Sequence, residues 1–430
     1  MFLTPNHLWN FIRRGDNRKL AFNFANYGFY QGVNYLIPLV TIPYIVRIIG
    51  VSYFGVLSFA QAVIYYLMIV VEYGFSYTGV QLIAQNKSPQ KQSEAISAIF
   101  LIQFGIALIG LLSLGIGLII FQDIRNYRLV YLFTFLTIPA QILQAIWFYI
   151  GAEEMQFLNL INLTSRLLYI ILIFILVKQQ THYVLIPLIN AGAMLVAGIV
   201  SLSFIVRKFK IRFQLVSLQI IIMYLKDGWH LFVSIFSMNF YRNTNVLILG
   251  LVADNSAVGI YSAGEKLVKA LQSIFTPLTQ TLYPYISRVT VTEPGKSLRS
   301  IKILMKYMVI LTSVLTAVVI YYSKPITHLL FGAEFVLTSK IVKITSGMLV
   351  IGMVNYILGI LFMTNFGMKA QFSHAVVFTG IVNLFLCSAL SKLMGAVGAA
   401  IAFTSAEVIL SVLLISFIFN HRQQWIQKIN

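Results

Sequence analysis

Ionised side chains in the middle of long apolar stretches are the residues of this chain best suited to do chemistry. Arg166, Arg242 and Glu407 each lie near the centre of such a stretch. An ionised group at the centre of a membrane-spanning helix costs at least about 2.5 kcal/mol unless it faces a polar cavity or a partner. The sequence therefore predicts that these three residues line an interior space.

Neutral polar residues accompany both arginines. Asn162 lies four residues before Arg166, and this spacing places the two side chains on one helical face. The polar group around Arg242 is the densest in any apolar stretch, and it comprises Asn239, Tyr241, Asn243 and Asn245. Each group is typical of a helix face that borders a polar cavity.

A third set of charges follows at residues 265–269. Glu265 and Lys269 are four residues apart and can pair with each other, which leaves Lys266 on a different face. With Arg166 in one half of the chain and Arg242 and Lys266 in the other, cations would line both walls of a cleft. Guanidinium and ammonium groups bind phosphate by charge and by hydrogen bonds, so the pattern favours a phosphate-bearing substrate. The alternative is structural, with each cation neutralising an acid or a carbonyl.

The acidic residues are candidates for ion coupling. Glu407 can pair with one of the arginines or carry a proton, because a low dielectric favours the neutral form of a carboxyl group. Glu265 is a second coupling candidate. Glu72, near the end of its apolar stretch, is expected to be a cap or turn residue and is a lesser one. The single cysteine and six scattered histidines predict no metal site and no cofactor.

Composition identifies an integral membrane protein. Apolar residues make up 59% of the 430 residues and charged residues 10%, and the mean hydropathy is +0.85. A span needs about 20 apolar residues, so a chain of this length has room for about twelve spans with short turns between them. The formal charge of +19 is accounted for by membrane topology, and we expect no nucleic-acid partner. The predicted fold class is an all-α polytopic membrane protein.

Apolar periodicity places six spans in each half of the chain. The first six are 24–46, 53–74, 96–121, 129–150, 158–177 and 183–206, and the second six are 229–252, 257–285, 303–323, 338–364, 372–393 and 396–419. The predicted domains are thus an N-terminal bundle at 1–206, a basic linker with an interfacial helix at 207–228, and a C-terminal bundle at 229–430. A short echo, GVLS at 55–58 and GIYS at 259–262, suggests that the halves are related.

Positive charge sets the predicted orientation. With the termini in the cytoplasm, eighteen lysines and arginines fall in cytoplasmic segments and six on the opposite side. The positive-inside rule therefore predicts a multi-pass protein of the cytoplasmic membrane with both termini in the cytoplasm.

Five stretches resemble a known family. They are PYIVRIIGVSYFG at 43–55, IWFYIGAEEM at 146–155, AVGIYSAGEKL at 257–267, LYPYISR at 282–288 and KPITHLLFGAEF at 324–335. In this order, across twelve spans, they resemble the bacterial O-antigen flippases. These form part of the polysaccharide-transport branch of the multidrug/oligosaccharidyl-lipid/polysaccharide exporter superfamily.

The resemblance implies two six-helix bundles related by a pseudo-two-fold axis, in a MATE-like fold that opens alternately to either side of the membrane. It implies transport of an oligosaccharide repeat unit on undecaprenyl diphosphate, from the cytoplasmic to the periplasmic leaflet of the bacterial inner membrane. It also implies cationic cavity residues for the diphosphate, a coupling proton or sodium ion, and other membrane proteins of polysaccharide assembly as further partners.

One stretch departs from the family pattern. WFYIGAE at 147–153 is similar to the signature WxFxGxE, but Tyr149 stands where phenylalanine is usual and Ile150 where glutamine is frequent. The resemblance implies a role for Glu153 and Glu154 at a cytoplasmic gate. A tight turn after an interfacial aromatic pair is the structural alternative.

Three other functions are weighed against the flippase. A cation or drug antiporter of the same superfamily would carry an excess of mid-span acids, whereas the central charges here are mostly basic. A membrane enzyme of polysaccharide assembly would need a cluster of acids, histidines or metal ligands, commonly in a large loop, and no loop here exceeds about twenty-five residues. A non-transporting scaffold would tolerate removal of the central cations. We therefore predict a transporter rather than an enzyme.

Overall fold

The computed structural model describes residues 15–426, and every regular element in that range is helical. The elements of the first half are α2 (Gly15–Glu72), α3 (Phe75–Gln85), α4 (Pro89–Ile120), α5 (Gln122–Asn126), α6 (Arg128–Phe135), α7 (Thr137–Gln144), α8 (Ile146–Gly151), α9 (Met155–Leu176), η1 (Gln180–Val184) and α10 (Leu185–Phe209).

The second half begins with the long helix α11 and ends with the short helix α20. Its elements are α11 (Leu218–Val252), α12 (Asn255–Ser273), α13 (Thr276–Thr292), α14 (Pro294–Tyr321), α15 (Ser323–Phe331), η2 (Ala333–Phe335), α16 (Val336–Ser346), α17 (Met348–Asn355), η3 (Tyr356–Met363), α18 (Lys369–Met394), α19 (Ala396–Asn420) and α20 (Arg422–Ile426).

The predicted spans coincide with these helices. Within the described residues, ten helical segments are long and apolar enough to cross a membrane, with Val40–Gln85 counted as one. α2 contains the first two predicted spans on either side of Gly50, whose φ of 76° and ψ of 176° break the helix. The eighth predicted span is divided between the shorter and more polar helices α12 and α13. The all-α membrane fold with about twelve spans is confirmed.

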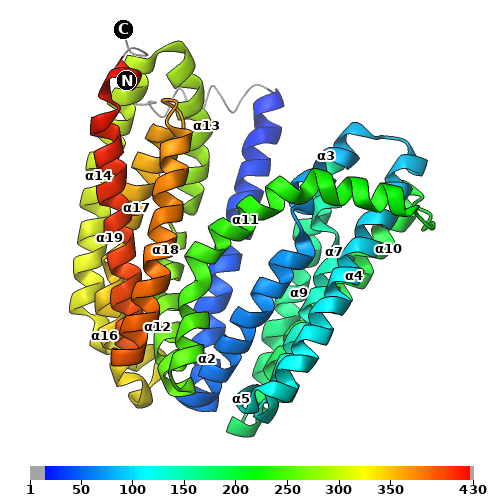
Figure 1. Cartoon of the computed structure of the whole chain (residues 1–430), viewed down its shortest axis with the longest axis horizontal. Helices are drawn as coiled ribbons and strands as arrows, with labels where there is room; N and C mark the ends of the chain where they lie inside the picture. The colour runs from blue at the N-terminus through cyan, green and yellow to red at the C-terminus, as the bar shows by residue number, and fades with distance from the viewer. Residues whose placement is uncertain (1–14, 427–430) are drawn as a thin grey trace.

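The two halves form the arms of a V (Figure 1). They meet where α2 turns and α12 begins, and they diverge toward the end where the first described turn of α2 and the last of α19 lie. One apolar core fills the first arm and continues across the junction through Ile49, Val56 and Val258. A second, smaller core lies in the other arm around Leu361 and Phe366.

Two glycines allow the arms to cross at the junction. A Cβ atom on Gly55 would lie 1.7 Å from the carbonyl oxygen of Asn255, and one on Gly259 would lie 2.1 Å from that of Val51. Each glycine thus meets the carbonyl four residues before the other glycine, as a pseudo-two-fold axis requires. Small residues let membrane helices approach this closely. The sequence echo at 55–58 and 259–262 therefore marks the crossing point of α2 and α12.

Arg47 holds the junction closed at the same end. Its guanidinium Nε donates a hydrogen bond to the carbonyl of Leu330 at 3.1 Å, and its Nη2 donates to the carbonyl of Leu329. Both carbonyls lie in the last turn of α15, where a helix exposes unpaired acceptors and a cation is favoured. The turn of α2 is thereby tied to the second arm.

Helix α11 connects the arms. Its first turns lie across the first arm, where the Phe232 ring stacks on the Tyr73 ring with centroids 4.8 Å apart. A Cβ on Gly228 would come within 3.2 Å of the Tyr73 carbonyl, so the backbones nearly touch. The rest of α11 packs against α18 and α12 (Figure 1). The helix that follows the basic segment is therefore continuous with the seventh span.

Reporter fusions test the predicted orientation. Alkaline phosphatase fused after Lys178 should be active, because this enzyme needs the periplasm, and fusions after Lys87 or Lys210 should be inactive. Three membrane crossings separate Lys87 from Lys178, and α10 alone separates Lys178 from Lys210. The excess of positive charge beside Lys87 and Lys210 is expected to retain those segments in the cytoplasm. Phosphatase activity at Lys210 would overturn the orientation.

Candidate functional site

Lys266 lies on α12 where the two arms meet. Its ammonium Nζ donates hydrogen bonds to Gln61 Oε1 at 3.2 Å and to Ser58 Oγ at 3.4 Å, both on α2. The same Nζ lies 4.8 Å from the ring centre of Phe54, a cation–π distance. Among the described residues Lys266 has no ion pair. A lysine without an ion pair among the described residues therefore lies at the contact between the arms.

The neighbouring charges on α12 neutralise each other. Lys269 Nζ lies 3.1 Å from Glu265 Oε1, so the pair expected from the four-residue spacing forms. The Glu265 side chain is 7% exposed, and it also accepts a hydrogen bond from the Tyr261 hydroxyl at 3.4 Å. Lys269 is therefore the ion-pair partner of Glu265, and Lys266 is left with neutral hydrogen-bond partners.

A chain of hydrogen bonds starts inside the second arm. Asn383 Nδ2 donates to Asn245 Oδ1 at 2.8 Å, and Asn245 Nδ2 donates to the Tyr261 hydroxyl at 3.3 Å. Tyr261 in turn donates to Glu265. These side chains are buried, and such networks rigidify the helices that carry them.

The chain continues to the first arm through Lys269. Lys269 Nζ donates to Asn243 Oδ1 at 3.4 Å, and Asn243 Nδ2 donates to the Tyr65 hydroxyl at 3.4 Å. Tyr65 on α2 donates to Asn239 Oδ1 at 2.6 Å. Three predicted polar residues, Asn239, Asn243 and Asn245, therefore belong to one network that joins α11, α12 and α2.

A small pocket also borders Lys266. It lies between the first limb of α2 and helices α12 and α15, and its lining residues are Pro38, Ile42, Pro43, Lys266, Leu267, Ala270, Leu330 and Phe331. Lys266 is thus enclosed by both limbs of α2, the one before Gly50 and the one after it.

The two arginines lie on different helices, Arg166 on α9 and Arg242 on α11. Arg166 and Asn162 are half-buried on α9, which packs mainly against α10 and α2 in the first arm. The neighbouring Ser165 hydroxyl donates to the Ala193 carbonyl of α10 at 3.0 Å. The side chains of Arg242 and Tyr241 lie outside the described residues, and only their positions on α11 are established.

The remaining acids occupy three separate places. Glu407 on α19 accepts a hydrogen bond from Asn355 Nδ2 at 2.7 Å. Glu154, in the turn between α8 and α9, forms an ion pair with Lys208 near the end of α10, and Glu153 beside it has a φ of 62°. The Glu154 pair lies within the first arm. The gate role of Glu153 and Glu154 remains a prediction.

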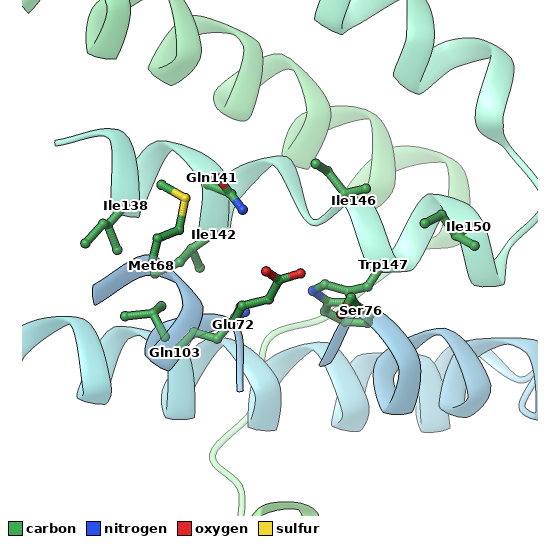
Figure 2. A pocket seen from close by; sticks show the side chains of 11 residues that line it. Met68, Glu72, Ser76, Gln103, Ile138, Gln141, Ile142, Ile146, Trp147 and Ile150 are labelled. Atoms are coloured by element: carbon green, nitrogen blue, oxygen red, sulfur yellow. The ribbon is translucent and has the colours of Figure 1, made fainter. Parts of the chain in front are cut away.

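Glu72 occupies the third of these places. It is the last residue of α2, at the turn where it was expected, and it lines a pocket inside the first arm with Ser76, Gln103 and Trp147 (Figure 2).

Sequence reasoning missed the partners of Lys266 and two members of the asparagine network, Tyr65 and Asn383. Ser58 and Gln61 are three residues apart and share a face of the second span, a signal that polar residues in an apolar stretch could have provided. Nothing in the sequence distinguishes Tyr65 from the other tyrosines of the chain. Asn383 lies alone in its span, and only its contact with Asn245 reveals a role.

The chain was compared with known proteins. It is 28% identical over 393 residues to a "Putative O-antigen transporter" of Escherichia coli (strain K12), covering 91% of this chain and 95% of the relative. A protein with the same name from Shigella dysenteriae is 26% identical, covering 90% and 96%. Both relatives are named as transporters.

Solved structures share the fold at low sequence identity. The inward closed conformation of the lipid II flippase MurJ superposes with a TM-score of 0.74 at 14% identity, over 95% of this chain and 90% of that one. An inward-facing multidrug resistance MATE family transporter of the MOP superfamily gives 0.67 at 12% identity, over 90% and 94%. Residues 20–290 match the family described as "Polysaccharide biosynthesis protein", and the chain belongs to that family.

Proposed function

We propose that this protein is a flippase that moves undecaprenyl-diphosphate-linked oligosaccharide repeat units from the cytoplasmic to the periplasmic leaflet of the bacterial inner membrane. The observation that carries the proposal is Lys266, a cation without an ion pair among the described residues, at the contact between two arms that must separate. A diphosphate is the part of such a lipid that needs a cation in a low-dielectric interior.

The surrounding groups suit the rest of the head group. The amides of Asn239 and Asn243 and the hydroxyl of Tyr65 donate and accept hydrogen bonds, as recognition of sugar hydroxyls requires. Tyr65 is 38% exposed, so a substrate can reach it. Arg242 and Tyr241 lie on the same helix as these asparagines, and Arg166 and Asn162 on α9 extend the proposed set into the first arm.

Alternating access is proposed as rocking of the arms about the glycine crossing. The arms are closed at Gly55, Gly259 and Arg47 and diverge at the other end (Figure 1). With the termini in the cytoplasm, this arrangement faces inward. Residues 1–206 and 229–430 would move as the two bodies, with 207–228 as the linker. Glu265, Glu407 and Glu72 are the candidates for coupling to a proton or sodium ion, and Glu153 and Glu154 for the gate.

Deletion of the gene tests the function. Cells that lack the protein should lose surface polysaccharide and accumulate undecaprenyl-linked repeat units in the cytoplasmic leaflet, because synthesis continues while translocation stops. The measurements are gel analysis of surface polysaccharide and mass spectrometry of lipid-linked intermediates, with the wild-type gene on a plasmid as the control. Normal polysaccharide in the deletion strain would exclude the flippase assignment. Full rescue by a variant that lacks Arg166, Arg242 and Lys266 together would instead indicate a scaffold.

A further inference from the structure

A pocket inside the first arm is separate from the contact between the arms. It lies among α2, α3, α4, α7 and α8 (Figure 2). Its lining residues are Met68, Val71, Glu72, Ser76, Gln103, Ile138, Gln141, Ile142, Ile146, Trp147 and Ile150. Glu72 is the only ionisable residue among these eleven, so no cation on any of the surrounding helices lines the pocket beside its carboxylate.

Two buried polar groups of the pocket lack hydrogen-bond partners within the part of the chain that the structure describes. They are the amide oxygen Oε1 of Gln103 and the indole nitrogen Nε1 of Trp147, and both residues are 5% exposed. In Figure 2 the Trp147 nitrogen is turned toward the Glu72 carboxyl group. A buried unsatisfied polar group is destabilising, so such a pair in one pocket calls for an explanation.

The two groups require hydrogen-bond partners of opposite kinds. Gln103 Oε1 is an acceptor that requires a donor, whereas Trp147 Nε1–H is a donor that requires an acceptor. An ionised Glu72 can only accept, so it can satisfy Trp147 but not Gln103. A protonated Glu72 has one O–H donor and one carbonyl acceptor, which are the two functions that Gln103 Oε1 and Trp147 Nε1–H require.

We propose that this pocket is a proton-binding site in which Glu72 takes up one proton from water. The proton binds to one carboxylate oxygen, the new O–H donates to Gln103 Oε1, and the other oxygen accepts from Trp147 Nε1–H. Ser76, in the first turn of α3, also hydrogen-bonds the Glu72 side chain. The indole N–H makes the pocket a poorer site for a metal cation, because a donor hydrogen repels positive charge.

The position of the pocket links it to the contact between the arms. Glu72 ends α2, and the next two residues, Tyr73 and Gly74, have positive φ values of 47° and 81°. The start of α11 packs on this turn through Phe232 and Gly228. A change of charge at Glu72 therefore acts on the joint between α2, α3 and the helix that connects the arms. A coupling role for the proton rests on the proposed transport, but proton binding itself is measurable without transport.

Fluorescence of Trp147 measures the proton directly. In a full-length variant with Trp9, Trp229 and Trp425 replaced by phenylalanine, the purified protein should change its emission reversibly between about pH 4 and about pH 9, because the charge beside the indole is lost on protonation. Glu72→Gln in this background should remove the transition and give the low-pH emission throughout. Its amide donates and accepts as the neutral acid does, so the fold is preserved.

Three further measurements complete the test. Gln103→Leu should move the midpoint to lower pH, with proton affinity reduced about fivefold to about tenfold, because the protonated form loses its acceptor. Glu334→Gln, at an exposed carboxylate in the turn after α15, should leave the transition unchanged. A flat wild-type trace, or a transition that persists in Glu72→Gln, would overturn the proposal. An emission change on adding sodium chloride but not choline chloride at constant pH would overturn the choice of a proton.

Discussion

Replacing Lys266 by methionine should lower flipping per folded molecule by about tenfold to about a hundredfold, since a lost hydrogen bond to a charged group costs about 1.5 to 3 kcal/mol. Methionine preserves most of the apolar stem of lysine and loses only the ammonium group that lies over the Phe54 ring, so the protein should still accumulate. The drop in transport would then be caused by the missing charge at the contact between the arms. The measurement is export of labelled repeat units, normalised to the amount of protein in the membrane.

Two further variants sharpen this test. Lys266→Arg should recover part of the activity, because the positive charge remains while its geometry changes. Lys296→Met is the matched control, because Lys296 lies on the surface in a pair with Glu293 and should be dispensable. If Lys266→Met accumulates normally and transports at the wild-type rate, Lys266 has no part in the mechanism.

The second large effect is expected at the glycine crossing. Gly55→Ala and Gly259→Ala should each reduce transport at least about tenfold, because a methyl group cannot fit 1.7 Å or 2.1 Å from a carbonyl oxygen and must push α2 and α12 apart. Overpacking of this kind costs about 1 to 3 kcal/mol, so the melting temperature of the purified protein should also fall. Transport and thermal unfolding in detergent are the two measurements.

Gly117 provides the control for these substitutions. It also lies within a membrane helix, α4, but a Cβ atom there meets nothing within 4 Å. Gly117→Ala should therefore leave transport unchanged, and alanine has the better helix propensity by about 1 kcal/mol. Equal behaviour of Gly55→Ala and Gly117→Ala would show that the crossing tolerates separation of the helices.

Some features of the protein follow from the sequence alone. Apolar stretches of about 20 residues in a chain with 59% apolar and 10% charged residues predict packed membrane helices, because a helix satisfies its own backbone hydrogen bonds. The Glu265–Lys269 pair was likewise predictable, because two residues four apart on a helix are neighbours whatever surrounds them. The echo at 55–58 and 259–262 indicated two related halves, although it did not show that those segments touch.

Contacts between distant segments required the tertiary structure. The sequence ranked Arg166 and Arg242 with Lys266, but only packing shows that Lys266 meets Ser58 and Gln61 about two hundred residues away. Glu72 was predicted as a turn residue, and it does end α2. Its place beside Gln103 and Trp147 arises because α4 and α8 pack on that turn. Local spacing specifies which residues share a helix face, whereas the partner of each face depends on how the helices pack.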